Sequence, residues 1–413
     1  MPQLDRRAGF WTAALVAGLA LWASGAPTVV YPLYAHEWGL TPATTTLIFA
    51  VYPLVLVPVL VLFGNLSDVI GRRATMLYGL AALGLGALAF GLAPDLAWVL
   101  VGRALMGVGV GLSLSPATAA MIEFSSPGQQ TRASSATTAA TATGLALATL
   151  VGGALVQYGP WPTHLTFWVL VVVTALSAAL VWLLPRHTRD ETAGPWRPRR
   201  PHVPRDARAP FVAGTLAVSG AYAMGAIFLA LGAQIARDLV RSDDAFVGGA
   251  IISVSAVVIG VVAVLARRLA PRTAVTVGPP AAALGLALLI GAGVAHSLPL
   301  FLASSVVAGA GYSLLFSGGL GLVTASAPVH HRAAVLSAAY VVAYVLQAAA
   351  ALGIGALATS STLLRALEIG SPLVLALGVA ALVVARTGRT APAPTAASTP
   401  ARPVRPADAP VPR

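Results

Sequence analysis

The stretch Gly64-Asn-Leu-Ser-Asp-Val-Ile-Gly-Arg-Arg73 lies between two long apolar windows of the sequence, residues 38–67 and 74–94. A transmembrane helix needs about 20 consecutive apolar residues, so each window is long enough to cross a membrane once. The charged part of the stretch is then a short loop between two spans. Gly71 permits a backbone turn that a residue with a Cβ would resist. Asp68 stands at a helix end, where it can face the positive N-terminus of another helix.

The composition of the chain agrees with a membrane protein. Of 413 residues, 57% are apolar and 9% are charged, against roughly 25% charged in an average soluble domain. So few charges cannot cover a water-soluble fold, which excludes an ordinary soluble enzyme and a disordered chain. The chain contains no Cys, so it has no thiolate ligand for a metal or redox centre. We expect no metal and no cofactor.

Further apolar windows bring the predicted number of spans to twelve. They are residues 8–36, 96–122, 209–236, 245–266, 333–364 and 361–386, and two double windows, 133–185 and 273–331. The double windows are broken at Tyr158-Gly-Pro-Trp-Pro162 and at His296-Ser-Leu-Pro299, where Gly and Pro indicate turns. The first window is followed by further spans, and we expect it to be retained and not cleaved as a signal peptide.

The arginines predict the orientation of these spans. The chain has 25 basic residues, all of them Arg, and most fall in the loops on the side of the N-terminus. Cytoplasmic loops carry such an excess, so we expect both termini in the cytoplasm and the chain in the plasma membrane. The net charge of +12 then reflects topology, and we expect no nucleic-acid partner. The expected partners are the lipid bilayer, a small-molecule substrate and possible coupling protons, and the expected assembly is a monomer.

The spans divide into two related halves. Arg72 and Arg132 recur as Arg272 and Arg332, and Gly107-Val-Gly109 is matched by Gly309-Ala-Gly311. We predict an all-α membrane protein with two pseudo-symmetric six-helix bundles. Its parts are residues 1–185, a cytoplasmic linker at 186–209, residues 210–387 and a disordered tail at 388–413. The Arg- and Pro-rich linker either lies on the anionic inner leaflet or is a flexible tether. Such repeats place a binding site between the halves near the bilayer midplane.

The stretch at 64–73 resembles the signature loop of the major facilitator superfamily, G-x-L-[SA]-D-x-x-G-[RK]-[RK], at every constrained position. A second stretch, Arg103-Ala-Leu-Met-Gly-Val-Gly109, is similar to a span-four motif of the drug–proton antiporters of that family. In span five the resemblance is incomplete, because the Gly-Pro of those antiporters is replaced by Ala148-Thr149. The closing pair Gly152-Gly153 is present. The resemblance implies twelve spans and transport by alternating access.

The resemblance also implies a gate at the cytoplasmic face, with Asp68 against the start of span eleven near Arg332. Arg72 then needs a carboxylate, and Glu123 is the acid at the inner end of span four. The hypothesis is that these contacts hold the inner face shut; the alternative is that Arg72 and Arg73 only mark the cytoplasmic side. In the second half Arg268 and Pro271 replace the acid and the glycine, so the gate should be one-sided. The candidate gating residues are Gly64, Asp68, Gly71, Arg72, Arg73, Glu123 and Arg332.

Arg103 is the charge deepest in a span. A charge in lipid costs several kcal/mol unless it meets water or a partner, so Arg103 either binds substrate or tunes a proton site, or it is a structural hub for helix carbonyls. Tyr340, Tyr344 and Gln347 share one helix face, and either form a cavity wall or join helices by hydrogen bonds. The resemblance implies that spans one, four, seven and ten line the centre. The candidate cavity residues are Tyr31, Arg103, Tyr222, Phe228, Tyr312, Phe316, Tyr340, Tyr344 and Gln347.

The leading functional prediction is a secondary active transporter of small organic molecules, with proton-coupled efflux implied by the resemblance. No acid stands in the middle of a span, so an uptake carrier or facilitator for a sugar, carboxylate or other metabolite stays open. A receptor or scaffold is a further alternative, although it would leave the loop at 64–73 without a clear use. The sequence has no phosphate-binding G-x-x-x-x-G-K-[ST] and no enzyme-like constellation of acids, histidines or nucleophile. We therefore expect neither ATP-driven transport nor an enzyme.

Overall fold

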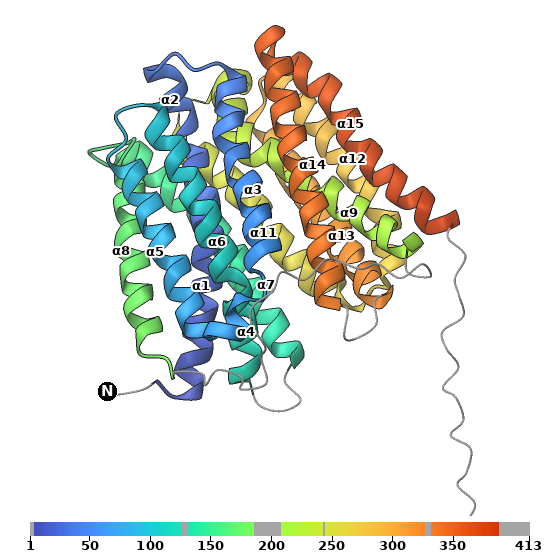
Figure 1. Cartoon of the computed structure of the whole chain (residues 1–413). Coiled ribbons are helices and arrows are strands. Elements are labelled where there is room, and N and C mark those ends of the chain that lie inside the picture. Colours follow the sequence, from blue (N-terminus) through green and yellow to red (C-terminus); the bar gives the residue numbers. More distant parts are fainter. Residues whose placement is uncertain (1–3, 126–129, 186–207, 243, 327–331, 388–413) are drawn as a thin grey trace, which may run out of the picture.

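The computed structural model of the chain describes residues 4–125, 130–185, 208–242, 244–326 and 332–387, and in these ranges the regular structure is helical (Figure 1). The side chains of residues 130–135, 326 and 332–334 lie outside this description. Twelve helical segments of the described chain are long and apolar enough to cross a membrane, as predicted. The interval predicted as a linker, 186–209, falls mostly outside the described residues, although α9 already begins at Arg208; the tail at 388–413 lies outside them entirely.

The first six spans form one bundle, drawn from blue to green in Figure 1. Its elements are α1 (Arg6–Gly25), a 3₁₀ turn (Ala26–Val29), α2 (Tyr31–Glu37), α3 (Pro42–Phe63), α4 (Leu66–Ile70), α5 (Arg72–Gly91), α6 (Leu96–Phe124), α7 (Gln130–Tyr158) and α8 (Leu165–Trp182). The signature stretch differs from the predicted loop, because Leu66–Ile70 forms a short helix. Gly71 ends it with φ of 93°, a left-handed conformation that favours glycine, and α5 begins at the next residue.

The last six spans form the second bundle, drawn from yellow-green to red. Its elements are α9 (Arg208–Ala226), a π-helical turn (Ile227–Leu231), α10 (Gly232–Gln234), a second π-helical turn (Ile235–Leu239), α11 (Ala245–Leu265), a 3₁₀ turn (Ala266–Arg268), α12 (Pro271–Ala295), α13 (Leu298–Ser326), α14 (Arg332–Ser360) and α15 (Leu363–Thr387).

The two bundles repeat one packing plan. In the first, α1 packs on α6 and α7, α5 on α6 and α8, and α3 on α6. In the second, α9 packs on α13 and α14, α12 on α13 and α15, and α11 on α13. These helices correspond one to one in chain order. The bundles meet along two antiparallel pairs, α7 with α11 and α3 with α14.

Two faces of the molecule are named here by their composition. The arginine face is the one at which α1 begins, with Arg6, Arg72, Arg73, Arg267 and Arg268, and it points down in Figure 1. The opposite end is the far face. Asp95 and Asp244 cap the far-face starts of α6 and α11, and each carboxylate accepts two backbone N–H groups. Large apolar side chains such as Leu85, Leu176 and Leu373 are exposed between the faces, as expected for a surface that contacts lipid.

The first span of each bundle departs from α-helical geometry at a matching place. Pro27 has no N–H to donate, and the chain turns from α1 into the 3₁₀ segment Ala26–Val29. In the second bundle α9 passes into the π-helical segment Ile227–Leu231. The two irregular segments contact each other between the bundles. Irregular backbone at membrane depth is tolerated where protein covers it, and π-helical turns are frequent at functional sites.

Glycines set the close approach of α1 and α7. A Cβ at Gly144 would overlap the carbonyl oxygen of Gly18, which is backbone and cannot move aside. At Gly291 in α12 a Cβ would meet nothing within 4 Å. Overfilling a packed site costs about 1–3 kcal/mol, whereas Ala in an open helical site gains roughly 0.5–1 kcal/mol.

We therefore expect Gly144→Ala to lower the melting temperature of the purified chain and Gly291→Ala to leave it unchanged or raise it. Scanning fluorimetry of the two variants beside wild type measures both. Equal melting temperatures for the two variants would contradict the close α1–α7 packing.

Candidate functional site

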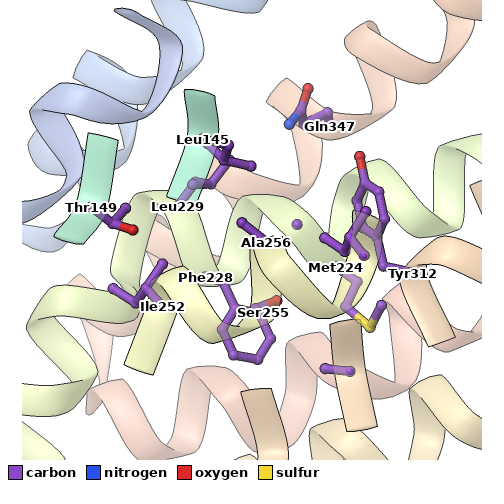
Figure 2. A pocket seen from close by; sticks show the side chains of 13 residues that line it. Leu145, Thr149, Met224, Phe228, Leu229, Ile252, Ser255, Ala256, Tyr312 and Gln347 are labelled. Carbon is purple, nitrogen blue, oxygen red and sulfur yellow. The ribbon is translucent and has the colours of Figure 1, made fainter. Parts of the chain in front are cut away.

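A cavity of about 60 Å³ lies where the bundles meet, lined by α7 of the first bundle and by α9, the adjoining π turn, α11, α13 and α14 of the second. Figure 2 shows Leu145 and Thr149 of α7 on one side and Tyr312 and Gln347 on the other. The central cavity, as we name it, is lined by Leu145, Thr149, Met224, Gly225, Phe228, Leu229, Ile252, Ser255, Ala256, Ile259, Ala308, Tyr312 and Gln347.

Most of this lining is apolar, and none of its side chains is charged. The hydroxyl of Thr149 donates to the carbonyl of Ala146 in its own helix, at 3.3 Å. Gln347 is 8% exposed, and its Oε1 has no hydrogen-bond partner among the described residues. The Gln347 carboxamide is therefore a buried polar group of the lining with unused hydrogen-bonding capacity, beside the hydroxyls of Ser255 and Tyr312.

An aromatic cluster adjoins the central cavity through Tyr312. Tyr222 lies at its middle, with ring centroids 4.9 Å from Tyr344, 5.7 Å from Phe316 and 6.4 Å from both Tyr312 and Tyr340. Offset and tilted ring pairs at such distances are favourable. The cluster lies wholly in the second bundle, on α9, α13 and α14.

The candidate cavity residues thus separate into three groups. Phe228, Tyr312 and Gln347 line the central cavity. Tyr222, Phe316, Tyr340 and Tyr344 lie behind it in the aromatic cluster. Tyr31 and Arg103 lie inside the first bundle, outside the lining, and their predicted role in binding substrate remains a proposal.

Arg103 is fully buried in α6, among α1 and α3. Its Nη1 donates to the carbonyl of Ser24 at 3.1 Å and its Nε to the carbonyl of Ile48 at 3.2 Å. Ser24 belongs to the last turn of α1, where carbonyls lack a helical partner. The guanidinium carbon lies 4.9 Å from the ring centroid of Tyr52, a favourable cation–π distance. Arg103 therefore joins three helices at the break in the first span.

Helices α7 and α11 supply lining residues that the sequence prediction missed, among them Thr149, Ile252 and Ser255. The small residues of span five were the sequence feature from which the contact between α7 and α11 could have been predicted. Gly153 lies against the backbone of α11, where a Cβ would come within 2.8 Å of the carbonyl oxygen of Ala245, and Gly249 lies against the carbonyl of Thr149. Such close approach places α7 and α11 side by side at the centre.

The far face is closed by hydrogen bonds between the bundles. The N–H of Ala43 donates to Thr359 Oγ1 and the N–H of Ala245 donates to Gln157 Oε1, each at 2.9 Å. Arg237 Nη1 donates to the carbonyl of Pro32 at 3.2 Å. These bonds join α3 to α14, α7 to α11, and the first span to the seventh.

A second cavity of about 230 Å³ lies under this closure, lined by Val29, Pro32, Leu33, Val156, Ala233, Ala236, Arg237, Ser242, Asp244, Ala245, Gly248 and Gly249. Its two charged side chains are already engaged. Arg237 donates to Pro32, and Asp244 Oδ1 accepts the N–H groups of Phe246 and Val247 at 2.8 and 3.1 Å. The Gly153–Gly249 contact lies between this cavity and the central one.

On the arginine face, Arg72 pairs with two acids of its own bundle. Its Nη1 lies 2.6 Å from Asp68 Oδ1 and its Nε 3.0 Å from Glu123 Oε1, and Nη1 also donates to Ser67 Oγ. The Arg72–Glu123 pair expected from the sequence is present. Asp68 is half-exposed and pairs with Arg72, while the Arg332 side chain at the start of α14 lies outside the described residues. The predicted contact of Asp68 with span eleven stays a prediction.

Arg73 and Arg6 bind helix ends on the same face. Arg73 Nη1 donates to the carbonyl of Leu184 at 3.0 Å, just after α8, and its guanidinium carbon lies 4.9 Å from the ring centroid of Trp182. Arg6 Nη2 donates to the carbonyls of Glu123 and Ser125 at the end of α6. Cations are favourable at helix C-termini, so Arg73 and Arg6 also stabilise the ends of α8 and α6.

Comparison with known proteins identifies the family. Residues 11–351 match the Major Facilitator Superfamily, and the chain belongs to that family. The family is one of transporters and not of enzymes. In fold it is similar to a bacterial homologue of the human lysosomal transporter Spinster, with a TM-score of 0.71, 15% identity and coverage of 94% of this chain and 99% of that one. A variant of the nucleoside transporter NupG gives a TM-score of 0.73 at 11% identity, covering 91% and 99%.

Among curated proteins the chain is similar in part to a resistance protein, an efflux pump and an export protein. It is 31% identical over 170 residues to the puromycin resistance protein pur8 of Streptomyces alboniger, covering 40% of this chain and 33% of pur8. It is 32% identical over 172 residues to the multidrug efflux pump LfrA of Mycolicibacterium smegmatis, with coverage of 40% and 33%. The cephamycin export protein CmcT of Amycolatopsis lactamdurans is 29% identical over 171 residues, with coverage of 41% and 34%. The chain spans about a third of the length of these relatives.

Truncating Arg103 tests the structural part of its role. Arg103→Ala leaves the carbonyls of Ser24 and Ile48 without this donor and opens a void between three helices. We expect a loss of roughly 2–4 kcal/mol of stability, seen as a lower melting temperature of the purified chain. Arg365→Ala, at an exposed arginine of α15, should change stability by less than about 0.5 kcal/mol. Similar melting curves for both variants would contradict the hub.

Proposed function

We propose that the chain exports small organic molecules across the plasma membrane by alternating access, driven by protons, with the arginine face in the cytoplasm. The partial similarity to pur8, LfrA and CmcT supports export. The concentration of arginines on one face supports the orientation. In this proposal the hydrogen bonds that join the bundles at the far face stabilise an inward-facing state.

The central cavity carries this proposal. It lies between the two bundles at the depth where both first spans lose α-helical geometry, and the far-face hydrogen bonds separate it from the opposite side. Rocking of the bundles about this point would expose the cavity to one side at a time. The α7–α11 and α3–α14 contacts would have to loosen at the far face during the switch.

Uptake or facilitated diffusion is the second candidate, favoured by the position of the acids. Each Asp and Glu of the described chain lies in a loop or near the end of a helix: Asp5, Glu37, Asp68, Asp95, Glu123, Asp238, Asp244 and Glu368. A proton-driven carrier usually has a protonatable group within the membrane. The ionisable side chains of the described residues at that depth are tyrosines and Arg103.

Transport assays separate the two candidates. Inside-out vesicles from cells that produce the chain should accumulate an uncharged organic compound with one ring and one amide or hydroxyl group when a pH gradient is imposed, acid inside. Collapsing the gradient with nigericin should abolish the accumulation. Entry that survives nigericin but stops at the outside concentration would favour a facilitator, and accumulation only in right-side-out vesicles would favour uptake.

The signature loop is proposed as a gate that closes the arginine face in the outward-facing state. Asp68→Asn removes the carboxylate charge that pairs with Arg72 here and that would meet the start of α14 on closure. An exposed ion pair contributes only about 0–1 kcal/mol, so we expect little change in melting temperature but at least a severalfold fall in the transport rate. Asp95→Asn is the matched control, because Asn caps a helix about as well as Asp. Equal transport rates in the two variants would contradict the gate.

A further inference from the structure

We propose that the central cavity takes a small, uncharged and largely apolar compound whose polar group hydrogen-bonds the Gln347 carboxamide. This inference rests on the proposed transport function, since it names the chemical class that the same cavity accepts. It rests on three observations about the cavity: the charge of its surroundings, its unused polar group and its size.

No charged side chain lines the central cavity, and Arg103, whose Nη2 has no hydrogen-bond partner among the described residues, lies outside the lining. The thirteen lining residues are uncharged. Arg103 is directed at the carbonyls of Ser24 and Ile48 and at the ring of Tyr52, none of which lines the cavity. Arg237 and Asp244 belong to the second cavity, beyond the Gly153–Gly249 contact. A desolvated charge without a partner is strongly unfavourable, so the cavity selects against both cations and anions.

Cation–π attraction does not change this conclusion. The rings of the aromatic cluster face one another at centroid distances of 4.9–6.5 Å. Of its members, only Tyr312 belongs to the lining. The faces that would attract a cation are therefore largely covered by neighbouring rings. Phe228 and Tyr312 instead offer the cavity an apolar and polarisable surface.

Gln347 supplies the polar anchor. Its side chain is 92% buried (8% exposed), lines the cavity, and has an Oε1 without a hydrogen-bond partner among the described residues. A carboxamide can donate and accept, and its terminal torsion is broad, so either end can be presented. Figure 2 shows Gln347 and Tyr312 on the same side, opposite Leu145 and Thr149. A ligand with an amide, hydroxyl or carbonyl at one end and an apolar body fits this arrangement.

Size limits the ligand further. One water needs roughly 10–15 Å³ on the scale that gives this cavity about 60 Å³. The conformation described here therefore holds a compound of one ring or a similar apolar group. Gly225 contributes to this space, since a Cβ there would come within 2.9 Å of the Tyr312 ring.

The absence of cysteine from the sequence allows a direct test in the full-length chain. Ala256→Cys places one thiol in the cavity lining, and Ser361→Cys places one on the exposed far-face loop. Each purified variant is labelled with 2-(trimethylammonium)ethyl methanethiosulfonate and with its uncharged isostere, 3,3-dimethylbutyl methanethiosulfonate. The ratio of the two rates at one position is independent of the reactivity of the thiol itself.

We expect the ratio of neutral to cationic labelling to be at least about 30-fold larger for Ala256→Cys than for Ser361→Cys, because a cation must leave water without gaining a partner. Equal ratios at the two positions would overturn the exclusion of charge. Failure of both reagents to label Ala256→Cys would overturn the assignment of the cavity as a ligand site.

Benzamide, an uncharged ring with one carboxamide, tests the anchor. It should protect Ala256→Cys from the neutral reagent. Adding Gln347→Met should raise the half-protecting concentration by about 5–10-fold, the effect of one lost hydrogen bond. Gln234→Met is the matched control: Gln234 also has a buried Oε1 without a described partner, but it lies outside the lining of both cavities. No protection by benzamide, or equal protection in both double variants, would overturn the role of Gln347.

These measurements are made in detergent and require no net transport. A charge-selective cavity in a chain that fails every vesicle assay would leave the inference standing and reject the proposed export. Transport of permanent cations, together with equal labelling ratios at the two positions, would support the proposed export and reject the inference about the cavity.

Discussion

Inside a bilayer every backbone N–H and C=O must find a partner within the protein, and this constraint shapes the whole chain. It accounts for the helical form of the described spans and for the place of the exceptions. The 3₁₀ turn at Ala26–Val29 and the π turn at Ile227–Leu231 lie where the bundles cover each other. Arg103 also supplies a hydrogen-bond partner for the backbone, since it donates to the carbonyl of Ser24 where α1 ends. The most buried charged side chain of the described chain thus forms hydrogen bonds with backbone carbonyls.

Most of the architecture could be predicted because its signals are local and strong. Runs of apolar residues, the arginines between them and the turn residues at 158–162 and 296–299 indicated twelve spans. The signature at 64–73 indicated the family, which residues 11–351 match. Pro27 is a residue from which the break in span one could have been predicted, although it was not, and no comparable residue indicates the π turns of span seven. A π turn needs no special residue, because it depends on how the helix is packed.

The candidate site could be predicted only in part. Which side chains line the cavity depends on how each helix is rotated about its axis, and the residue type does not reveal that rotation. Phe228, Tyr312 and Gln347 face the cavity, whereas the equally aromatic Tyr222 and Phe316 stack behind it. Arg103 stood out as a charge in a span, yet its two carbonyl partners lie on other helices and could not be read from spacing. The contributions of α7 and α11 depended on Gly153 and Gly249, whose importance appears once the two backbones are seen in contact.

The hydrogen bonds across the far face differ in how easily a single substitution can remove them. Two of their three donors, at positions 43 and 245, are main-chain N–H groups that almost any replacement except proline would preserve. Their acceptors are side chains, Thr359 and Gln157. Substitutions at positions 43 and 245 would therefore keep these hydrogen bonds, while a single substitution at Thr359 or Gln157 would remove one bond between the bundles. Such changes would leave the lining of the central cavity untouched.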